Sequence, residues 1–465
     1  MPVSVAAAPP TIADQPTATY GARRVAILLA AFPVLGFLAW AVYHAVTVVR
    51  AFTGHHVNQL AFAWAFSFLL LWWVPVAWLE KPWRVTARQQ CYLDSLTVAV
   101  QVPVFNEDPA ALKAALESLF RQTRRPDRIL VVDDGSADDL ADVQAWFMAS
   151  ARALGIDGTW QVHPVNKGKR HAQMTALTRD RSDIIVALDS DSILDRRAIA
   201  EGLKPFAYPK VTSVAGLVAV LNTRTNWLTL MTAMLYTPFT RGFRSAQSVL
   251  KRVLVNSGTL AFYRGEVVRQ YAGVYENETF RGRPMQMNDD SMLTFYGLIA
   301  GDAVHQPTCV AYTLVPDRIS PYVKQQMRWM RGTFVRTFWW FRYAPRVTSP
   351  VFWMPVLELV QLILSVAIPV VLFMQPAARS DAGAIGISTL MVGAGINWMI
   401  ALRFLMVSRS DEPTWLHVLL VMSAPIAGLW RLVIVKPMYL YALATFWRIG
   451  SWGTRLSGVE VGLDL

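Results

Sequence analysis

Residues 96–105, Leu-Thr-Val-Ala-Val-Gln-Val-Pro-Val-Phe, form an almost unbroken apolar run. Such a run is typical of a strand that is buried on both faces, as in a parallel sheet. Apolar residues at helical spacing then predict a helix over 109–122, and two more apolar runs predict strands over 128–132 and 184–188. This alternation of strands and helices favours a doubly wound α/β domain, which binds nucleotides beyond the carboxyl ends of its strands.

Acidic residues follow two of these predicted strands. Asp133 and Asp134 come after the second strand, and Asp189-Ser190-Asp191 comes after the third. The first pair could accept hydrogen bonds from a nucleoside or could cap a helix. The second pair places two carboxylates on one side of an extended backbone, which suits a divalent cation bridging a diphosphate. The chain contains neither GxGxxG nor GxxxxGK[ST], so we expect no dinucleotide or P-loop site.

Two more clusters carry chemistry. Lys169 and Arg170 belong to a basic loop between the acidic strand ends, where they are suited to phosphate, although an isolated basic loop is usually solvated. Asp289 and Asp290 precede a predicted helix. A carboxylate there could deprotonate an acceptor hydroxyl, with a helix N-cap as the alternative, particularly for Asp289.

The composition predicts a membrane protein with a soluble part. Of 465 residues, 54% are hydrophobic and 16% are charged, against about 45–50% and about 25% in ordinary soluble domains. The formal net charge of +12 fits the excess of Lys and Arg on cytoplasmic loops better than it fits binding to nucleic acid. Two cysteines, Cys91 and Cys309, do not make a disulfide framework.

Apolar runs and their basic flanks predict the membrane topology. The last run, about 415–447, is short for two spans and long for one, and we expect a re-entrant pair there. The predicted order is a disordered cytoplasmic tail (1–22), a transmembrane hairpin (23–80), a cytoplasmic domain (96–317), interfacial helices (318–346), C-terminal transmembrane or re-entrant helices (350–447) and a cytoplasmic loop and tail (448–465).

The interfacial stretch 318–346 has seven Lys or Arg and no acidic residue, which is typical of an amphipathic helix at a lipid surface. Gln325, Arg328 and Trp329 share one face of this helix. That face could hold a sugar against the indole ring.

Together these motifs resemble the processive, membrane-integrated family 2 glycosyltransferases, which include the hyaluronan, chitin, chitooligosaccharide and cellulose synthases. The resemblance covers about 96–345 and the flanking helices. After the last apolar run, Trp452-Gly453-Thr454-Arg455 is similar to the loop with which hyaluronan synthases close over the nucleotide. The other motifs that carry the resemblance are Val104-Phe105-Asn106-Glu107, Val132-Asp133-Asp134-Gly135-Ser136, Asp189-Ser190-Asp191, Ser257-Gly258-Thr259, Asp289-Asp290 and Gln325-x-x-Arg328-Trp329.

The resemblance implies a GT-A nucleotide-binding fold in the cytoplasmic domain, UDP-sugar donors, and Mg²⁺ or Mn²⁺ as the cofactor. It also implies a role for each residue of the site. These roles are uridine contact for Asp133 and Asp134 with Lys169 and Arg170 nearby, metal binding for Asp189 and Asp191, general base for Asp290, diphosphate support for Gln325 and Arg328, acceptor stacking for Trp329, and gating for Trp452 and Arg455.

The expected function is processive, inverting polymerisation of UDP-GlcNAc and UDP-GlcA into a β-linked polysaccharide. The enzyme would sit in the inner membrane and secrete the polymer through its own channel. A homopolymer synthase of the chitin type, a single-transfer enzyme acting on a lipid or cell-wall acceptor, and an inactive scaffold are alternatives. One departure bears on the sugar: Asn288-Asp289-Asp290-Ser291 stands where hyaluronan and chitooligosaccharide synthases usually have Gly-Asp-Asp-Arg. The sequence leaves open the sugars, linkage, chain length, direction of growth and oligomeric state.

Overall fold

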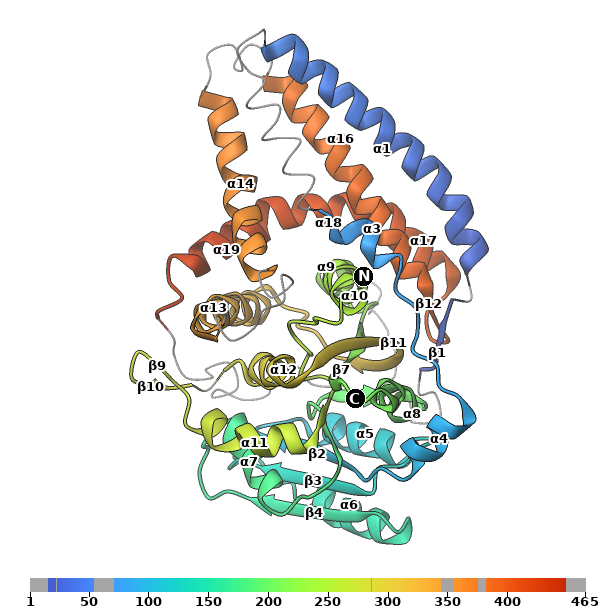
Figure 1. Ribbon diagram of the computed structural model, residues 1–465, viewed down its shortest axis with the longest axis vertical. Helices are drawn as coiled ribbons and strands as arrows, with labels where there is room; N and C mark the ends of the chain where they lie inside the picture. Colours follow the sequence, from blue (N-terminus) through green and yellow to red (C-terminus); the bar gives the residue numbers. More distant parts are fainter. Residues whose placement is uncertain are drawn as a thin grey trace, which may run out of the picture.

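The computed structural model describes residues 16–21, 23–53, 71–285, 287–343, 354–374 and 382–448. Figure 1 shows an α/β domain at one end of the molecule and a group of long helices at the other. Between them lie α9, α10 and α13, so the two parts meet over a broad contact.

The α/β domain is built on an eight-stranded mixed sheet in the order β4-β3-β2-β5-β8-β7-β11-β6. The strands β4, β3, β2 and β5 are parallel, whereas β8 runs antiparallel to both β5 and β7. The strand bounds are β2 (Val98–Val104), β3 (Arg128–Asp133), β4 (Asp157–Val162), β5 (Ile184–Ala187), β6 (Ser192–Leu194), β7 (Val211–Val220), β8 (Ala261–Arg264) and β11 (Asp302–Thr313).

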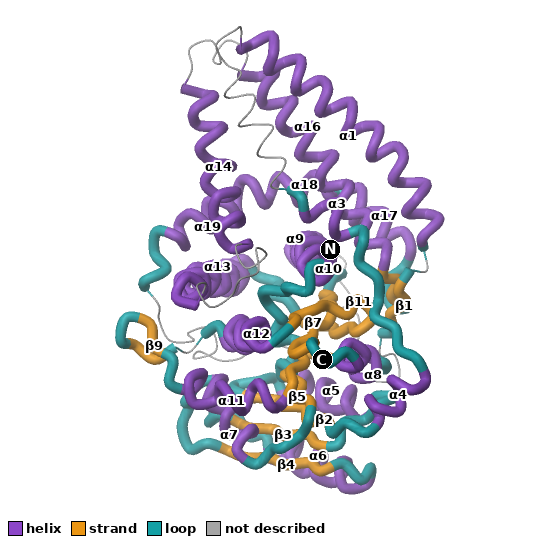
Figure 2. Tube along the Cα trace, in the orientation of Figure 1, coloured by secondary structure: helices purple, strands orange, loops and turns teal. Residues whose placement is uncertain are grey.

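Helices surround this sheet, and a short hairpin projects from its side (Figure 2). The helices of the domain are α4 (Ala87–Asp94), α5 (Pro109–Phe120), α6 (Ala141–Ala153), α7 (Lys169–Thr178), α8 (Ala198–Leu203), η3 (Lys204–Ala207), α11 (Gly265–Glu276) and α12 (Asp289–Ala300), and the hairpin is β9 (Thr279–Phe280) with β10 (Arg283–Pro284).

The continuous apolar strands are explained by burial on both faces. On β5, Ile184 and Val186 belong to one buried cluster, whereas Ile185 and Ala187 belong to a second cluster on the opposite face. Because successive side chains of a strand point to opposite faces, both faces must be covered. The predicted doubly wound α/β fold is confirmed.

The predicted helix over 109–122 is α5. Asp108 caps it by accepting a hydrogen bond from Ala110 N at 3.0 Å, and Pro109 occupies the first turn, where a missing N–H costs nothing. The leucines at 112 and 116 are fully buried against the sheet.

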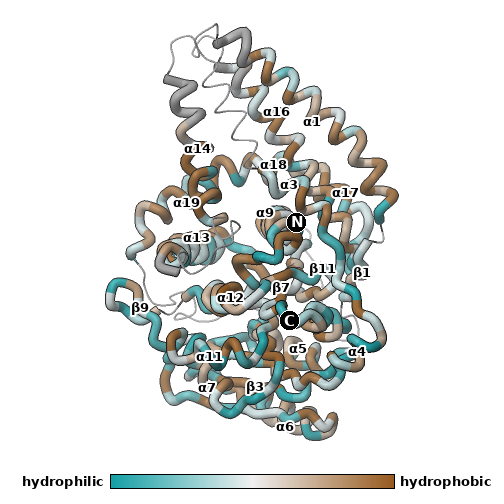
Figure 3. The backbone as a smooth tube through the Cα atoms, viewed as in Figure 1, coloured by the Kyte–Doolittle hydropathy of each residue, from teal (hydrophilic) through white to brown (hydrophobic). Residues whose placement is uncertain are grey.

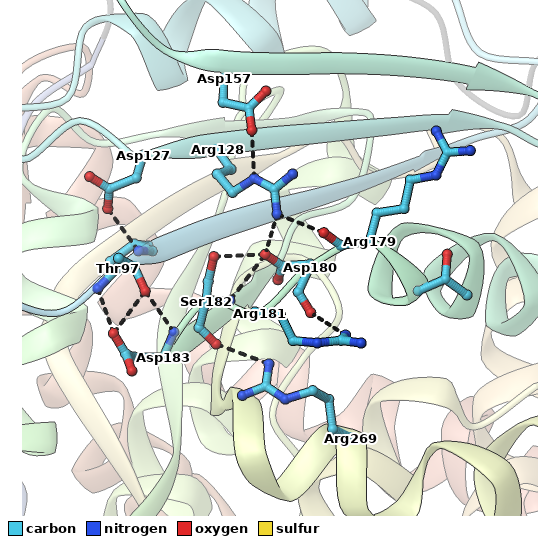
Figure 4. A network of polar contacts seen from close by, with 12 residues as sticks. Thr97, Asp127, Arg128, Asp157, Arg179, Asp180, Arg181, Ser182, Asp183 and Arg269 are labelled. Carbon is cyan, nitrogen blue, oxygen red and sulfur yellow. Dashed lines mark hydrogen bonds and ion pairs between the residues drawn. The ribbon is translucent and has the colours of Figure 1, made fainter.

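At the amino edge of the sheet, hydrogen bonds and ion pairs tie the strand starts together (Figure 4). Asp183 accepts hydrogen bonds from Thr97 N at 2.8 Å and from Thr97 Oγ1 at 2.7 Å. Arg128 bridges Asp157 at 2.7 Å and Asp180 at 2.9 Å. Asp183 and Asp157 accept from donors on other segments, and Asp180 Oδ1 accepts from Arg128, whereas the buried Asp180 Oδ2 has no hydrogen-bond partner among the described residues.

Three described segments are long and apolar enough to cross a membrane, namely Arg24–Val48, Gly386–Met406 and Ala424–Thr445. Hydrophobic colour predominates on them in Figure 3, in contrast to the mixed α/β domain. The helices of this part are α1 (Arg24–Thr53), α3 (Trp73–Ala77), α14 (Met354–Met374), α16 (Ala382–Ala401), η7 (Leu402–Met406), α17 (Thr414–Met422), α18 (Ala424–Trp430), η8 (Arg431–Val435) and α19 (Lys436–Leu443).

The last apolar region does not fold back as a simple pair. The run from α17 to α19 crosses beneath α14 and α16 (Figure 1). Within it, η8 is a π-helical segment, a conformation that often marks functional sites. A second π-helical segment, η4 (Phe239–Phe243), joins α9 (Trp227–Pro238) to α10 (Arg244–Val249).

Three other predictions need comment. The disordered tail expected for 1–22 is wrong at Ala18–Tyr20, which forms β1 and pairs antiparallel with β12 (Val407–Arg409). The partner strand lies almost the whole chain away, so local composition gave no sign of it. Of the second apolar run of the predicted hairpin, about 60–79, residues 60–70 lie outside the described residues. The predicted interfacial stretch is a single helix, α13 (Ile319–Tyr343).

Candidate active site

One cavity of about 530 Å³ connects the carboxyl edge of the sheet with α13 and the helices above it. Among the predicted site residues, its wall includes carboxylates and cations at one end and the side chains of α13 at the other. Those residues are Asp134, Lys169, Asp189, Asp191, Asp290, Gln325, Arg328 and Trp329.

The Asp-Ser-Asp motif begins two residues after the end of β5 at Ala187. Lys169 Nζ lies 2.7 Å from Asp189 Oδ1 and 2.8 Å from Asp289 Oδ2. Burial alone would lower the pKa of Lys169, but these two carboxylates outweigh burial and raise that pKa above its usual value. The ammonium therefore stays charged and links the strand end to α12.

The Ser257-Gly258-Thr259 loop lies between the two groups of carboxylates. Gly258 N donates a hydrogen bond of 3.3 Å to Asp290 Oδ2. A Cβ at position 258 would lie 2.8 Å from Lys169 Nζ and 3.3 Å from Asp189 Oδ1. Only glycine allows the loop to approach both, since no side chain fits there.

Asp290 has the properties of a general base. Its Oδ1 accepts a 2.6 Å hydrogen bond from Ser291 N, and the side chain faces the cavity. Burial, reinforced by the neighbouring Asp289 carboxylate, raises the pKa of Asp290 to about 6. A carboxylate with this pKa is ionised at neutral pH and basic enough to accept a proton. The alternative of an N-cap is not observed, because Asn288 occupies the N-cap of α12.

Asp133 and Asp134 hold the turn after β3. Asp133 Oδ1 accepts from Ser136 N at 2.9 Å. Asp134 accepts from Gly168 N at 2.6 Å and from His163 Nδ1 at 2.7 Å. Asp134 borders the cavity, whereas Asp133 does not line it. Both carboxylates thus hold the loops at the carboxyl edge of the sheet, and the capping alternative is not observed, because the following helix α6 has Leu140 at its N-cap with no side-chain cap.

Arg170 was predicted to lie beside the nucleotide, but its side chain turns the other way. It is buried, forms an ion pair with Glu278, and donates to Met287 O at 2.8 Å and to Asn288 O at 3.1 Å. Its guanidinium also lies 4.6 Å from the ring centroid of Tyr275. Arg170 therefore holds the segment that leads into Asp290.

The Gln-x-x-Arg-Trp motif lies on α13, and its three side chains reach the same cavity. Trp329 is 42% exposed, and its ring centroid lies 6.1 Å from that of Tyr236 on α9. The two rings form an aromatic wall on which a sugar can stack.

The sequence reasoning missed Arg244 on α10. This buried arginine donates to Gly216 O at 3.1 Å and to Ser257 Oγ at 2.7 Å. Burial lowers the pKa of Arg244 to about 10, so it remains charged at neutral pH. It supports the loop whose Gly258 contacts Asp290. A basic residue in a helix carries no sequence signal for this role, because its partners lie on other segments.

Charged side chains also line the membrane end of the cavity. Arg336 from α13, Glu358 from α14 and Arg431 from η8 all contribute to this wall, together with Tyr439 from α19. Buried atoms without a hydrogen-bond partner among the described residues include Gln325 Oε1, Arg336 Nε and Glu358 Oε1. This end of the cavity can therefore accept a polar ligand.

The acidic residues fit a divalent cation held jointly with a substrate. The described part of the chain has no cluster of three or more His, Cys, Asp or Glu side chains around one point. Asp189 and Asp191 offer the hard oxygen ligands that Mg²⁺ and Mn²⁺ accept, and diphosphate oxygens would complete the set. Trp452 and Arg455, predicted as a gating loop, lie outside the described residues.

A mixed α/β sheet, an Asp-x-Asp motif after a central strand and a buried carboxylate of raised pKa on the same cavity are the features of a GT-A glycosyltransferase. Residues 99–272 match glycosyl transferase family 2. A mannosyltransferase from Pyrobaculum calidifontis has the same fold, with a TM-score of 0.52 at 20% identity over 87% of this chain and 98% of that one.

Relatives with similar sequences indicate which members of this family the chain is similar to. A hyaluronan synthase from Streptococcus pyogenes serotype M1 is 33% identical over 363 residues, which are 77% of this chain and 83% of that one. An N-acetylglucosaminyltransferase from Azorhizobium caulinodans is 36% identical over 241 residues, which are 51% of this chain and 59% of that one. The chain therefore belongs to glycosyl transferase family 2, among the hyaluronan synthases and their relatives. The predictions of family and enzyme class are confirmed.

Proposed function

We propose that the protein is a processive, inverting glycosyltransferase that polymerises UDP-GlcNAc and UDP-GlcA into a β-linked polysaccharide. The observation that carries this proposal is the single cavity that runs from Asp189 and Asp290 past Trp329 to the apolar helices. A growing polymer could move along this path as each sugar is added.

The donor would bind at the carboxyl edge of the sheet. Asp133 and Asp134 would face the uridine side, and Gln325 and Arg328 the diphosphate side. Asp189, with Asp191, would hold Mg²⁺ or Mn²⁺, which supplies positive charge to stabilise the leaving diphosphate. The Pyrobaculum mannosyltransferase, whose structure is a complex with GDP-Man and Mn²⁺, supports a metal-dependent nucleotide-sugar site in this fold.

The transfer itself would use Asp290. Its carboxylate takes the proton from an acceptor hydroxyl while that oxygen attacks the anomeric carbon of the donor. The new glycosidic bond forms on the face opposite the bond to the diphosphate, which breaks and releases UDP. A single displacement inverts the configuration, so an α-linked donor gives a β-linked product.

The acceptor would stack on Trp329 and Tyr236 and continue toward the membrane end of the cavity. Two arginines there, Arg336 and Arg431, outnumber the single acid Glu358. An excess of positive charge favours a polymer that carries carboxylates, and therefore glucuronate, over an uncharged homopolymer.

The enzyme would lie in the inner membrane with the α/β domain on the cytoplasmic side, where the basic flanks of the apolar helices belong. Trp452 and Arg455 would close over the bound nucleotide. The partners would be the UDP-sugars, the growing polysaccharide and the bilayer, without nucleic acid.

The decisive experiment measures UDP release by the purified full chain with Mg²⁺ or Mn²⁺. UDP-GlcNAc, UDP-GlcA and UDP-Glc are supplied singly and in pairs, with Asp290→Asn as the blank. Turnover that needs UDP-GlcNAc and UDP-GlcA together and yields a long product supports the proposal, and a chelator should abolish it.

Other outcomes of this experiment would replace the proposed function with a different one. Turnover with one sugar and a long product indicates a homopolymer synthase. Turnover with one sugar and a short product indicates a single-transfer enzyme. No turnover with any donor, with UDP binding intact, refutes the proposed donors.

A further inference from the structure

The helix that carries Asp290 is linked to α13 by an unusual N-cap. Asn288 has φ 61° and ψ 33°, in the left-handed region, where asparagine and glycine are the residues best tolerated. Its side chain does not cap its own helix. Instead, Asn288 Nδ2 donates a 2.7 Å hydrogen bond to Gly332 O on α13.

The contact depends on the absence of a side chain at position 332. A Cβ on Gly332 would lie 2.1 Å from Asn288 Oδ1 and 3.0 Å from its Cγ. Because real Cβ atoms do not approach that closely, any larger residue would displace the Asn288 amide and break its bond. The two residues are therefore matched across the two helices.

The two residues of this pair are close along the chain to the groups that would act on the acceptor. Asn288 precedes Asp290 by two residues, and Gly332 follows Trp329 by three, about one helical turn. From the other side, Arg170 donates to the Asn288 carbonyl at 3.1 Å. The segment before Asp290 is thus held between a buried arginine and α13.

We propose that Asn288 is a positioning residue, whose bond to Gly332 fixes the distance between Asp290 and the acceptor-binding face of α13. The inference rests on the proposed function, in which Asp290 is the base and Trp329 binds the acceptor. It accounts for the asparagine that replaces the glycine usual in hyaluronan and chitooligosaccharide synthases: asparagine keeps the left-handed conformation and adds a bond across the helices.

The test is a double-mutant cycle on the full chain. Gly332→Ala should lower kcat by about 10-fold or more, since small misplacements of reacting groups cost up to about 100-fold, while UDP binding stays unchanged. Asn288→Gly removes the amide that an alanine at position 332 would displace, so its loss of kcat should be smaller than that of Gly332→Ala. The double variant should recover activity to about the level of Asn288→Gly alone, because the clash no longer exists.

Two further variants make the test independent of how well Gly332→Ala folds and supply a control. Asn288→Asp retains the shape but cannot donate to the carbonyl, and should lower kcat even if Gly332→Ala folds poorly. Gly273→Ala on α11, where a Cβ would meet nothing within 4 Å, is the matched control and should keep full activity.

Three results would overturn the proposal: full activity in Gly332→Ala, no recovery in the double variant, or full activity in Asn288→Asp. A wild-type protein inert with every donor would refute the proposed function instead. The contact would then be judged by melting temperatures of the same variants, where additive effects at 288 and 332 would overturn it.

Discussion

Aspartates gather at both edges of the central sheet, and the two edges use them differently. At the amino edge, Asp183 is bonded to Thr97, and Asp157 and Asp180 share Arg128. These carboxylates are bonded to donors from neighbouring segments (Figure 4), and none of them lines the active-site cavity.

At the carboxyl edge, several carboxylates line one cavity and share few cations. Lys169 serves both Asp189 and Asp289, and Asp290 has a raised pKa. Carboxylates that crowd around one cation beside a cavity are suited to bind a metal or to move a proton. The difference indicates that access to the cavity and a neighbouring carboxylate, and not the residue type, separate a structural aspartate from one that can act.

The strongest test of this contrast is Asp290→Asn. The amide keeps the shape but cannot accept the proton, so kcat should fall by about 10²–10⁴-fold. UDP release at saturating donor measures the effect. UDP binding and melting temperature should be unchanged. Substantial turnover in this variant would show that another group is the base.

Asp180→Asn makes the equivalent change at the amino edge. Its carboxylate is buried and bonded to Arg128 and Ser182 Oγ, so we expect a loss of about 1–3 kcal/mol in the free energy of unfolding. Activity per folded molecule should be unchanged. Chemical denaturation measures the loss, with Asp142→Asn at an exposed position as the control. Lost kcat without lost stability would erase the distinction between the edges.

The pH dependence of kcat/KM should reflect the raised pKa of Asp290, about 6, because kcat/KM reports the ionising groups of the free enzyme. The group acts as a carboxylate, so activity should be constant above this pKa and fall about tenfold per unit below it. The decline in activity therefore lies on the acid side of this pKa. Initial rates measured over about two pH units on either side of this pKa record the dependence. A rate independent of acid pH argues against this base.

The smallest effect is expected for Trp329→Ala. Loss of ring stacking, about 0.5–1.5 kcal/mol, should weaken acceptor binding several-fold and shorten the product while leaving donor affinity unchanged. Trp329→Phe keeps an aromatic ring and should therefore retain part of the acceptor binding. Phe338→Ala, on the same helix but outside the cavity lining, is the control. Equal losses in both alanine variants would point to helix stability instead.

Local patterns predicted much of this protein. Apolar runs located β2, β3 and β5, and the acidic residues after β3 and β5 lie at the carboxyl edge as expected. Periodicity and composition also located α5, α13 and the apolar helices. These features depend on neighbours in the chain, which the sequence displays directly.

Contacts between distant segments could not be predicted in this way. Arg170 lies in the first turn of α7, in a basic stretch that suggested phosphate binding, yet its guanidinium binds Glu278 and two carbonyls far along the chain. Likewise, β1 pairs with β12, and Arg244 reaches Ser257 only because α10 packs beside that loop. In each case the partner was set by packing.

The sequence by itself determined that the chain has an α/β domain with carboxylates at the carboxyl edge of its sheet, and several long apolar helices, because burial and periodicity are local properties. Only the tertiary structure decided which charged groups face the cavity and which form ion pairs with one another. It also decided that Asn288 meets Gly332. The physical reason is that hydrogen bonds and excluded volume act between atoms in space, whatever their separation along the chain.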